Sequence, residues 1–137
     1  MWLRYAPALR RFEHLPGTWI MVVMDQLSDD FETLDDHTSP LSTSIFNDMS
    51  TKLDQFHAGG YVHGDICAVN IMVSKSDKKQ FMIIGFDWAG EQGTAWYPAY
   101  VNHDGITRPA GGQFGEEILT DHDSFMLKHI TETMSRQ

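Results

Sequence analysis

Two short polar stretches carry the residue types best suited to chemistry in this chain. Asp65 stands five residues before Asn70 in the first stretch, and Asp87 follows an apolar run in the second. A carboxylate can take a proton from a hydroxyl group, and amide and carboxylate oxygens suit Mg²⁺. We therefore interpret Asp65 as a candidate base and Asn70 and Asp87 as candidate ligands of a divalent cation.

Two β-prone segments between these residues predict a hairpin. Residues 71–73 and 81–84 are the expected strands, and the polar, lysine-bearing segment 74–80 is the expected tip. Asn70 and Asp87 lie just outside the two ends of this hairpin. Because antiparallel neighbours lie about 5 Å apart, one ion could bridge both side chains.

An amphipathic helix is expected directly before the first polar stretch. Ser39 can cap its free N–H groups, and Pro40 suits the first helical position. Glycines 59 and 60 end the helix. Its apolar stripe, at spacings of three and four, consists of Leu41, Ile45, Met49, Leu53 and Phe56.

The remaining segments are expected to be a strand, an acidic surface, a long loop and a second helix. Residues 19–24 predict a buried strand after a Pro-Gly turn. The acid-rich stretch 25–36 is typical of solvated surface. Residues 90–115 show no period and predict a loop that is functional or mobile. A helical face with a near capping box at Thr120 follows over residues 118–130.

The motif His63-x-Asp65-x-x-x-x-Asn70, an apolar hairpin and then Asp87-Trp88-Ala89-Gly90 resembles the catalytic loop and metal-binding segment of the protein-kinase-like fold. The likeness includes fungal kinase-like proteins. His-Gly-Asp and Asp-Trp also resemble the small-molecule branch of aminoglycoside and choline phosphotransferases. The resemblance implies that Asp65 is the catalytic base, that Asn70 and Asp87 hold Mg²⁺, and that ATP donates the phosphoryl group.

The same resemblance implies an α+β fold with most of the small lobe missing. Residues 1–27 would form the end of the small lobe and the hinge, and residues 28–137 an incomplete, mostly helical large lobe with a hairpin. ATP-contacting residues would lie at the hinge and beneath the adenine: Met24, Asp25, Leu27 and Met72.

Three further residues receive structural interpretations. His63 is expected to pack under the metal-binding segment near Trp88, and Cys67 to be a small buried side chain. An aspartate of the second helix would steady the catalytic loop, with Asp123 preferred to Asp121. A zinc site built from His63 with Asp65, His103 or His122 is an alternative that no compact ligand spacing supports.

The chain also departs from the kinase pattern. At 137 residues it is shorter than the roughly 250 that a full kinase-like domain needs. It has no glycine-rich phosphate loop before the hinge and no lysine before Lys52. Gly64 replaces the usual arginine, and Cys67 stands where many kinases place a lysine. We therefore expect weak or absent turnover from this chain.

Composition limits the possible partners. The net charge of −9 argues against nucleic acid, because phosphate binding needs clustered Lys and Arg. A single cysteine, no secretory signal and no long apolar run predict a cytoplasmic or otherwise intracellular protein without a membrane span. The phosphate acceptor, a protein or a small molecule, stays open.

Three functions follow from these observations. The first is a kinase-like domain whose ancestral activity is ATP-dependent phosphoryl transfer. The second is a non-catalytic pseudokinase that serves as a scaffold. In the third, a small-molecule kinase of the aminoglycoside or choline type, the acidic stretch Asp29 to Asp36 would attract a cationic acceptor.

Overall fold

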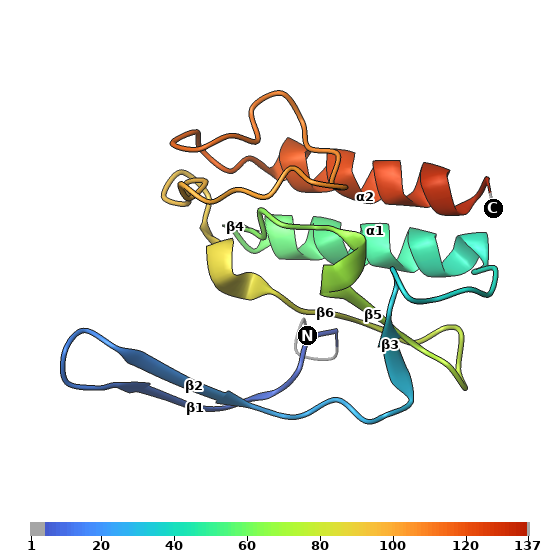
Figure 1. Cartoon of the computed structure of the whole chain (residues 1–137), viewed down its shortest axis with the longest axis horizontal. Coiled ribbons are helices and arrows are strands. Elements are labelled where there is room, and N and C mark those ends of the chain that lie inside the picture. The colour runs from blue at the N-terminus through green and yellow to red at the C-terminus, as the bar shows by residue number, and fades with distance from the viewer. Residues whose placement is uncertain (1–4, 137) are drawn as a thin grey trace.

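The computed structural model describes residues 5–136. Two long helices lie side by side and cover one face of a small sheet, and a two-stranded ribbon extends away from this body (Figure 1). The elements in chain order are β1 (Leu9–His14), β2 (Ile20–Met24), β3 (Phe31–Thr33), α1 (Thr43–Ala58), β4 (Tyr61–Val62), the 3₁₀ turn η2 (Ala68–Asn70), β5 (Ile71–Ser74), β6 (Phe81–Ile83), the 3₁₀ turn η3 (Phe86–Trp88), β7 (Gly90–Glu91) and α2 (Thr120–Met134).

The strands form three antiparallel sheets. The largest has the order β3-β5-β6, and the others pair β1 with β2 and β4 with β7. The expected hairpin is confirmed as β5 and β6, with Ile71 opposite Ile83. None of the helices in the described part of the chain is long and apolar enough to cross a membrane.

The main core lies between the two helices and the β3-β5-β6 sheet. Its members come from the inner faces of α1, α2, β5 and β6 and include Ile45, Met49, Leu53, Ile71, Val73, Phe81, Met126 and Ile130. Fully burying a side chain of this size contributes about 1.5–3 kcal/mol. This core holds the segment between α1 and β5 in place, and that segment contains Asp65.

The expected start of α1 is wrong by three residues. Ser42, rather than Ser39, is the N-cap residue, and Thr43 is the first helical residue. Leu41 packs against the core from outside the helix, so the Pro40 segment approaches α1 as an extended lead-in. The helix ends at Ala58 before the two glycines, as expected.

Strand β2 is not the buried strand that its apolar sequence predicts. Trp19 is 73% exposed and Met24 is 54% exposed, and the residues between them, except Met21, are also largely exposed. The ribbon has only two strands, and no described element covers either face of it. A continuous apolar run predicts a strand, but it does not predict whether another element packs on that strand and buries it.

The acidic segment after β2 is more structured than expected. It contains β3, which pairs with β5, and its Asp30 accepts hydrogen bonds from Ser74 and Ser76. Those hydrogen bonds lower the pKa of Asp30. At least one carboxylate of this segment, that of Asp30, therefore holds the end of β5 in place through hydrogen bonds.

Helix α2 begins one residue earlier in the chain than a cap at Thr120 would require. Thr120 is its first helical residue and Leu119 its N-cap residue, so the expected capping role of Thr120 is wrong. The Nδ1 atom of His122 instead accepts a hydrogen bond from the Leu119 amide at 3.3 Å. The Asp123 side chain does not cap the helix, because its carboxylate accepts hydrogen bonds from the backbone amides of His63 and Gly64.

Candidate functional site

Two antiparallel pairings hold the candidate loops side by side. The loop after β4 contains Asp65, and the loop after β6 contains Asp87. β4 pairs with β7 beyond the second loop, and β5 pairs with β6 between the two loops. The Ile84 amide adds a hydrogen bond of 2.9 Å to the carbonyl of Asn70. The predicted meeting of the two polar stretches therefore has a backbone basis.

The structure brings Asp65 and Asn70 into direct contact. The Asn70 amide nitrogen donates to the backbone carbonyl of Asp65 at 3.0 Å and to its Oδ2 atom at 2.9 Å. This orientation leaves the Asn70 amide oxygen as an available acceptor. Each carboxylate oxygen can accept more than one hydrogen bond, so Asp65 keeps acceptor capacity.

Gly85 lets the Asn70 side chain approach the second loop. Its φ is +71°, and a Cβ atom at this position would lie 2.4 Å from the Asn70 Oδ1 atom. Only glycine combines this left-handed backbone with so little space. The amide oxygen of Asn70 therefore packs against the backbone two residues before Asp87.

Asp87 is exposed within the η3 turn. Its carboxylate makes no hydrogen bond or ion pair with any residue in the described range 5–136. An amide oxygen and an unengaged carboxylate on adjoining loops form a hard donor set, which fits Mg²⁺. Groups of three or more His, Cys, Asp or Glu arranged to hold a metal do not occur among the described residues, so the structure adds no support for zinc.

Asp123 anchors the first loop from below. It is fully buried, and its two carboxylate oxygens accept the backbone amides of His63 at 2.8 Å and Gly64 at 2.7 Å. His57 of α1 contacts the same carboxylate at 3.0 Å. Asp121 is exposed. The preference for Asp123 as the residue that steadies the loop is confirmed.

His63 is structural, as expected, but its neighbour is different. The ring packs edge-on against Phe86 at 4.8 Å, rather than against Trp88. Its Nδ1 atom accepts the Asp65 amide, and its Nε2 atom donates to the Ile84 carbonyl. Burial lowers the pKa of His63, so the ring stays neutral and links the two loops.

The main residue that the sequence analysis missed is Arg108. Its guanidinium donates to the Oδ1 atom of Asp65 at 2.8 Å and to the carbonyl of Asn102 at 2.7 Å. It also lies over the Trp88 ring at 5.0 Å, and its side chain is 2% exposed. One sequence signal pointed to it, since Arg108 is the single Lys or Arg between Lys79 and Lys128.

The expected ATP-contacting residues lie on β2, on the connection that follows it and on β5. Met24 ends β2 in the ribbon, and Leu27 is half-buried in the connection to β3. The carboxylate of Asp25 pairs with Arg10, which holds the pKa of that carboxyl below its usual range. Met72 is half-buried in β5 opposite Met82. Their contact with a nucleotide remains a prediction.

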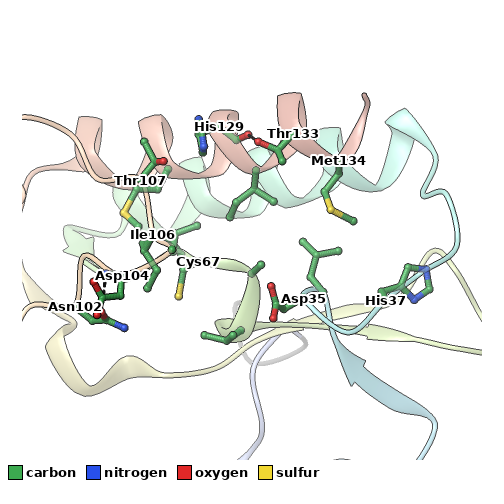
Figure 2. A pocket seen from close by; sticks show the side chains of 17 residues that line it. Asp35, His37, Cys67, Asn102, Asp104, Ile106, Thr107, His129, Thr133 and Met134 are labelled. Atoms are coloured by element: carbon green, nitrogen blue, oxygen red, sulfur yellow. Dashed lines mark hydrogen bonds between the residues drawn. The ribbon is translucent and has the colours of Figure 1, made fainter. Parts of the chain in front are cut away.

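A cavity of about 460 Å³ lies beside the first loop and is lined in part by residues 66–69, which follow Asp65. Its walls come from α2, from the segment after Asp65 and from residues 102–107. Figure 2 shows His129 and Thr133 along α2 and Met134 extending down from it, with Cys67 and Asp35 below the helix. Burial raises the pKa of Cys67 to about 11, which agrees with a protonated, packed thiol.

Comparisons with known proteins place this geometry in a known fold. The sequence matches no protein-family model, and no curated protein sequence matches it either. Among solved structures, it is similar to the kinase PK-1 of Cydia pomonella granulovirus, with a TM-score of 0.69 and 20% identity. The alignment covers 99% of this chain and 52% of that kinase, so the chain spans about half its length. The chain thus has a kinase-like fold.

Proposed function

We propose that this chain carries a phosphoryl-transfer site of the kinase type, with Asp65 as the base and Asn70 and Asp87 as Mg²⁺ ligands. One observation carries the proposal. The Asp65 carboxylate, the Asn70 amide and the loop bearing Asp87 adjoin one another on a backbone that Asp123 fixes from the core.

Each residue would have a separate task. Asp65 would accept the proton of a hydroxyl group as that group attacks the terminal phosphate of ATP. Asn70 would orient Asp65 through its amide nitrogen and offer its amide oxygen to the metal, together with the Asp87 carboxylate. Bound Mg²⁺-ATP would supply the phosphoryl group and neutralise its charge.

A radiolabelled ATP assay tests the assignment of the base. The full chain is incubated with Mg²⁺-ATP and a panel of hydroxyl acceptors, and label transfer or phosphate release is followed. Asp65→Asn should lower any turnover by at least tenfold, since it removes the proton acceptor while preserving shape. Equal rates in the two proteins would rule out Asp65 as the base.

A second candidate function is a non-catalytic scaffold, and the exposed ribbon favours it. β1 and β2 form a two-stranded ribbon whose apolar side chains Phe12, Trp19 and Ile20 are exposed, which suits contact with a protein partner. A thermal-shift titration separates the two functions. A rise in melting temperature that requires both Mg²⁺ and ATP supports the kinase site, and an unchanged melting curve supports the scaffold.

The cavity beside the first loop favours a small-molecule acceptor over a protein acceptor. Its volume is in the range of ligand sites, and two aspartates, Asp35 and Asp104, lie among its lining residues. Hydroxyl-bearing amines should then accept label in preference to neutral polyols of the same size in the ATP assay. Labelling of a generic protein substrate alone would contradict this acceptor class.

A further inference from the structure

The two acidic residues of the candidate site lie in different electrostatic environments. Asp65 is 20% exposed in its side chain and pairs with Arg108 at 2.8 Å. Asp87 is exposed and has no ion-pair partner among residues 5–136. A divalent cation near both loops would therefore meet one carboxylate whose charge is already balanced and one whose charge is not.

Arg108 is held in this position from several sides. Its Nε atom donates to the Asn102 carbonyl at 2.7 Å, and the guanidinium lies over Trp88 at 5.0 Å. The Nη1 atom approaches the sulfur of Met126 at 3.9 Å. With 2% of its side chain exposed, the guanidinium has little freedom to swing into solvent. The pairing with Asp65 is thus built into the fold of the loop that bears Arg108.

We propose that Arg108 is a positioning residue that assigns different roles to the two carboxylates, because it neutralises Asp65 and so directs a divalent cation to Asn70 and Asp87. Asp65 is then kept out of the metal shell and free to act as a base. This inference rests on the proposed function for the identity of the site. It adds a residue that no motif of the sequence indicated.

Divalent-ion binding in the absence of nucleotide tests the inference without requiring turnover. The binding of Mn²⁺ to the full chain is measured by electron paramagnetic resonance. Arg108→Met should tighten Mn²⁺ binding about fivefold, because the cation then meets an unbalanced Asp65 charge a few ångströms away. Arg108→Lys keeps the charge and should stay within about twofold of the unmodified chain.

Arg108→Met leaves a partly buried carboxylate unpaired, so a second pair of variants is needed in case it does not fold. Asp65→Asn leaves the arginine charge unbalanced and should weaken Mn²⁺ binding about fivefold. The double variant Asp65→Asn with Arg108→Met should return to within about twofold of the unmodified chain. Asp54→Asn, an exposed charge change on α1, is the control and should have no effect.

Two results would overturn the inference. In the first, Arg108→Met folds and leaves Mn²⁺ binding unchanged or weaker. In the second, the double variant stays as weak as Asp65→Asn, which would make Asp65 itself a ligand. Absence of Mn²⁺ binding in every variant would overturn both this inference and the proposed metal site.

Asp87→Asn separates the two proposals. If it abolishes Mn²⁺ binding while Arg108→Met changes nothing, the proposed metal site stands and the role of Arg108 fails. If Arg108→Met tightens Mn²⁺ binding while Asp87→Asn leaves the binding of the unmodified chain unchanged, Arg108 still neutralises Asp65, but the cation is not directed to Asp87 and the proposed ligand fails.

Discussion

At the residue scale, the close approach of Gly85 to Asn70 makes a direct prediction about the candidate site. Gly85→Ala should lower the free energy of unfolding by about 2–4 kcal/mol, since it adds backbone strain and a clash with the Asn70 side chain. Urea unfolding measures the change. Gly105 has the same φ of +71° and open space around it, so Gly105→Ala should show the backbone strain alone. Equal losses in both variants would contradict the packing argument.

The single cysteine gives a prediction about pH. Burial and the nearby Asp65 charge raise the pKa of Cys67 from its ordinary 9.0 to about 11. Between these values the unfolded chain loses the thiol proton while the folded chain retains it. The part of the stability that depends on this thiol should therefore be constant below pH 9 and be lost as pH rises toward 11.

Alkylation kinetics check the same property of Cys67. Iodoacetamide should react slowly with the folded chain at pH 8 and rapidly once urea unfolds it, because the thiolate is the reactive form. Cys67→Ala should remove the part of the stability loss above pH 9 that the thiol causes. Rapid alkylation of the folded chain would show that the thiol is neither buried nor held protonated.

Individual site residues could be identified from the sequence to very different degrees. Asp65, Asn70 and Asp87 can be chosen as candidates because their spacing around a hairpin is a local property of the chain. The structure brings their loops together, and their roles stay predictions. Arg108 was missed because its contact with Asp65 spans 43 residues and depends on how the long loop folds back. No period or spacing encodes such a contact.

At the element scale, the apolar strands β2 and β5 differ in burial: β2 is exposed and β5 is buried. Val22 in β2 is 48% exposed, whereas Val73 in β5 is fully buried between the helices and the sheet. Both segments are short and apolar, and their sequences alone predict buried strands for both. The difference arises from neighbours, since β5 lies between β3 and β6 and faces the core, while β2 has only β1.

This contrast can be tested with the same substitution in each strand. Val73→Ala should reduce the free energy of unfolding by about 2–3 kcal/mol, because it leaves a cavity in the core. Val22→Ala should change it by about 0.5 kcal/mol or less. Urea unfolding followed by circular dichroism gives both values. A large loss for Val22→Ala would mean that the ribbon is covered in solution.

Helix boundaries show a similar limit. The apolar stripe located α1 correctly, and the glycines located its end. Its start was misplaced because Ser39 and Ser42 are both good caps by type, and Leu41, which packs against the core, lies before the helix rather than in its stripe. The existence of an element is set by its own residues, but its first residue depends on what the adjoining chain contacts.

At the scale of the whole molecule, Asp123 joins three elements that are distant in sequence. Its carboxylate contacts α1 through His57 and the first loop through His63 and Gly64, and it belongs to α2. Asp123→Asn should lower the free energy of unfolding by about 3 kcal/mol, because a buried carboxylate with three partners is replaced by a group that cannot accept all of them.

The matched control lies two residues earlier on the same helix. Asp121→Asn changes an exposed charge of the first turn and should alter stability by about 0.5 kcal/mol or less. Chemical denaturation of the two variants side by side makes the comparison. Similar, small effects would mean that the loop does not depend on the Asp123 carboxylate.

The bond from Asp123 to the first loop also has a consequence for the order of events during synthesis. A ribosome makes the loop roughly 60 residues before it makes the carboxylate that fixes it. Growing chains fold from their N-terminal end, so α1 and the hairpin can form early while the loop between them waits without its anchor. A nascent polypeptide that has not yet emerged as far as α2 would therefore hold Asp65 and Asn70 in an unfixed arrangement. The candidate site would therefore take its final shape only after α2 is made.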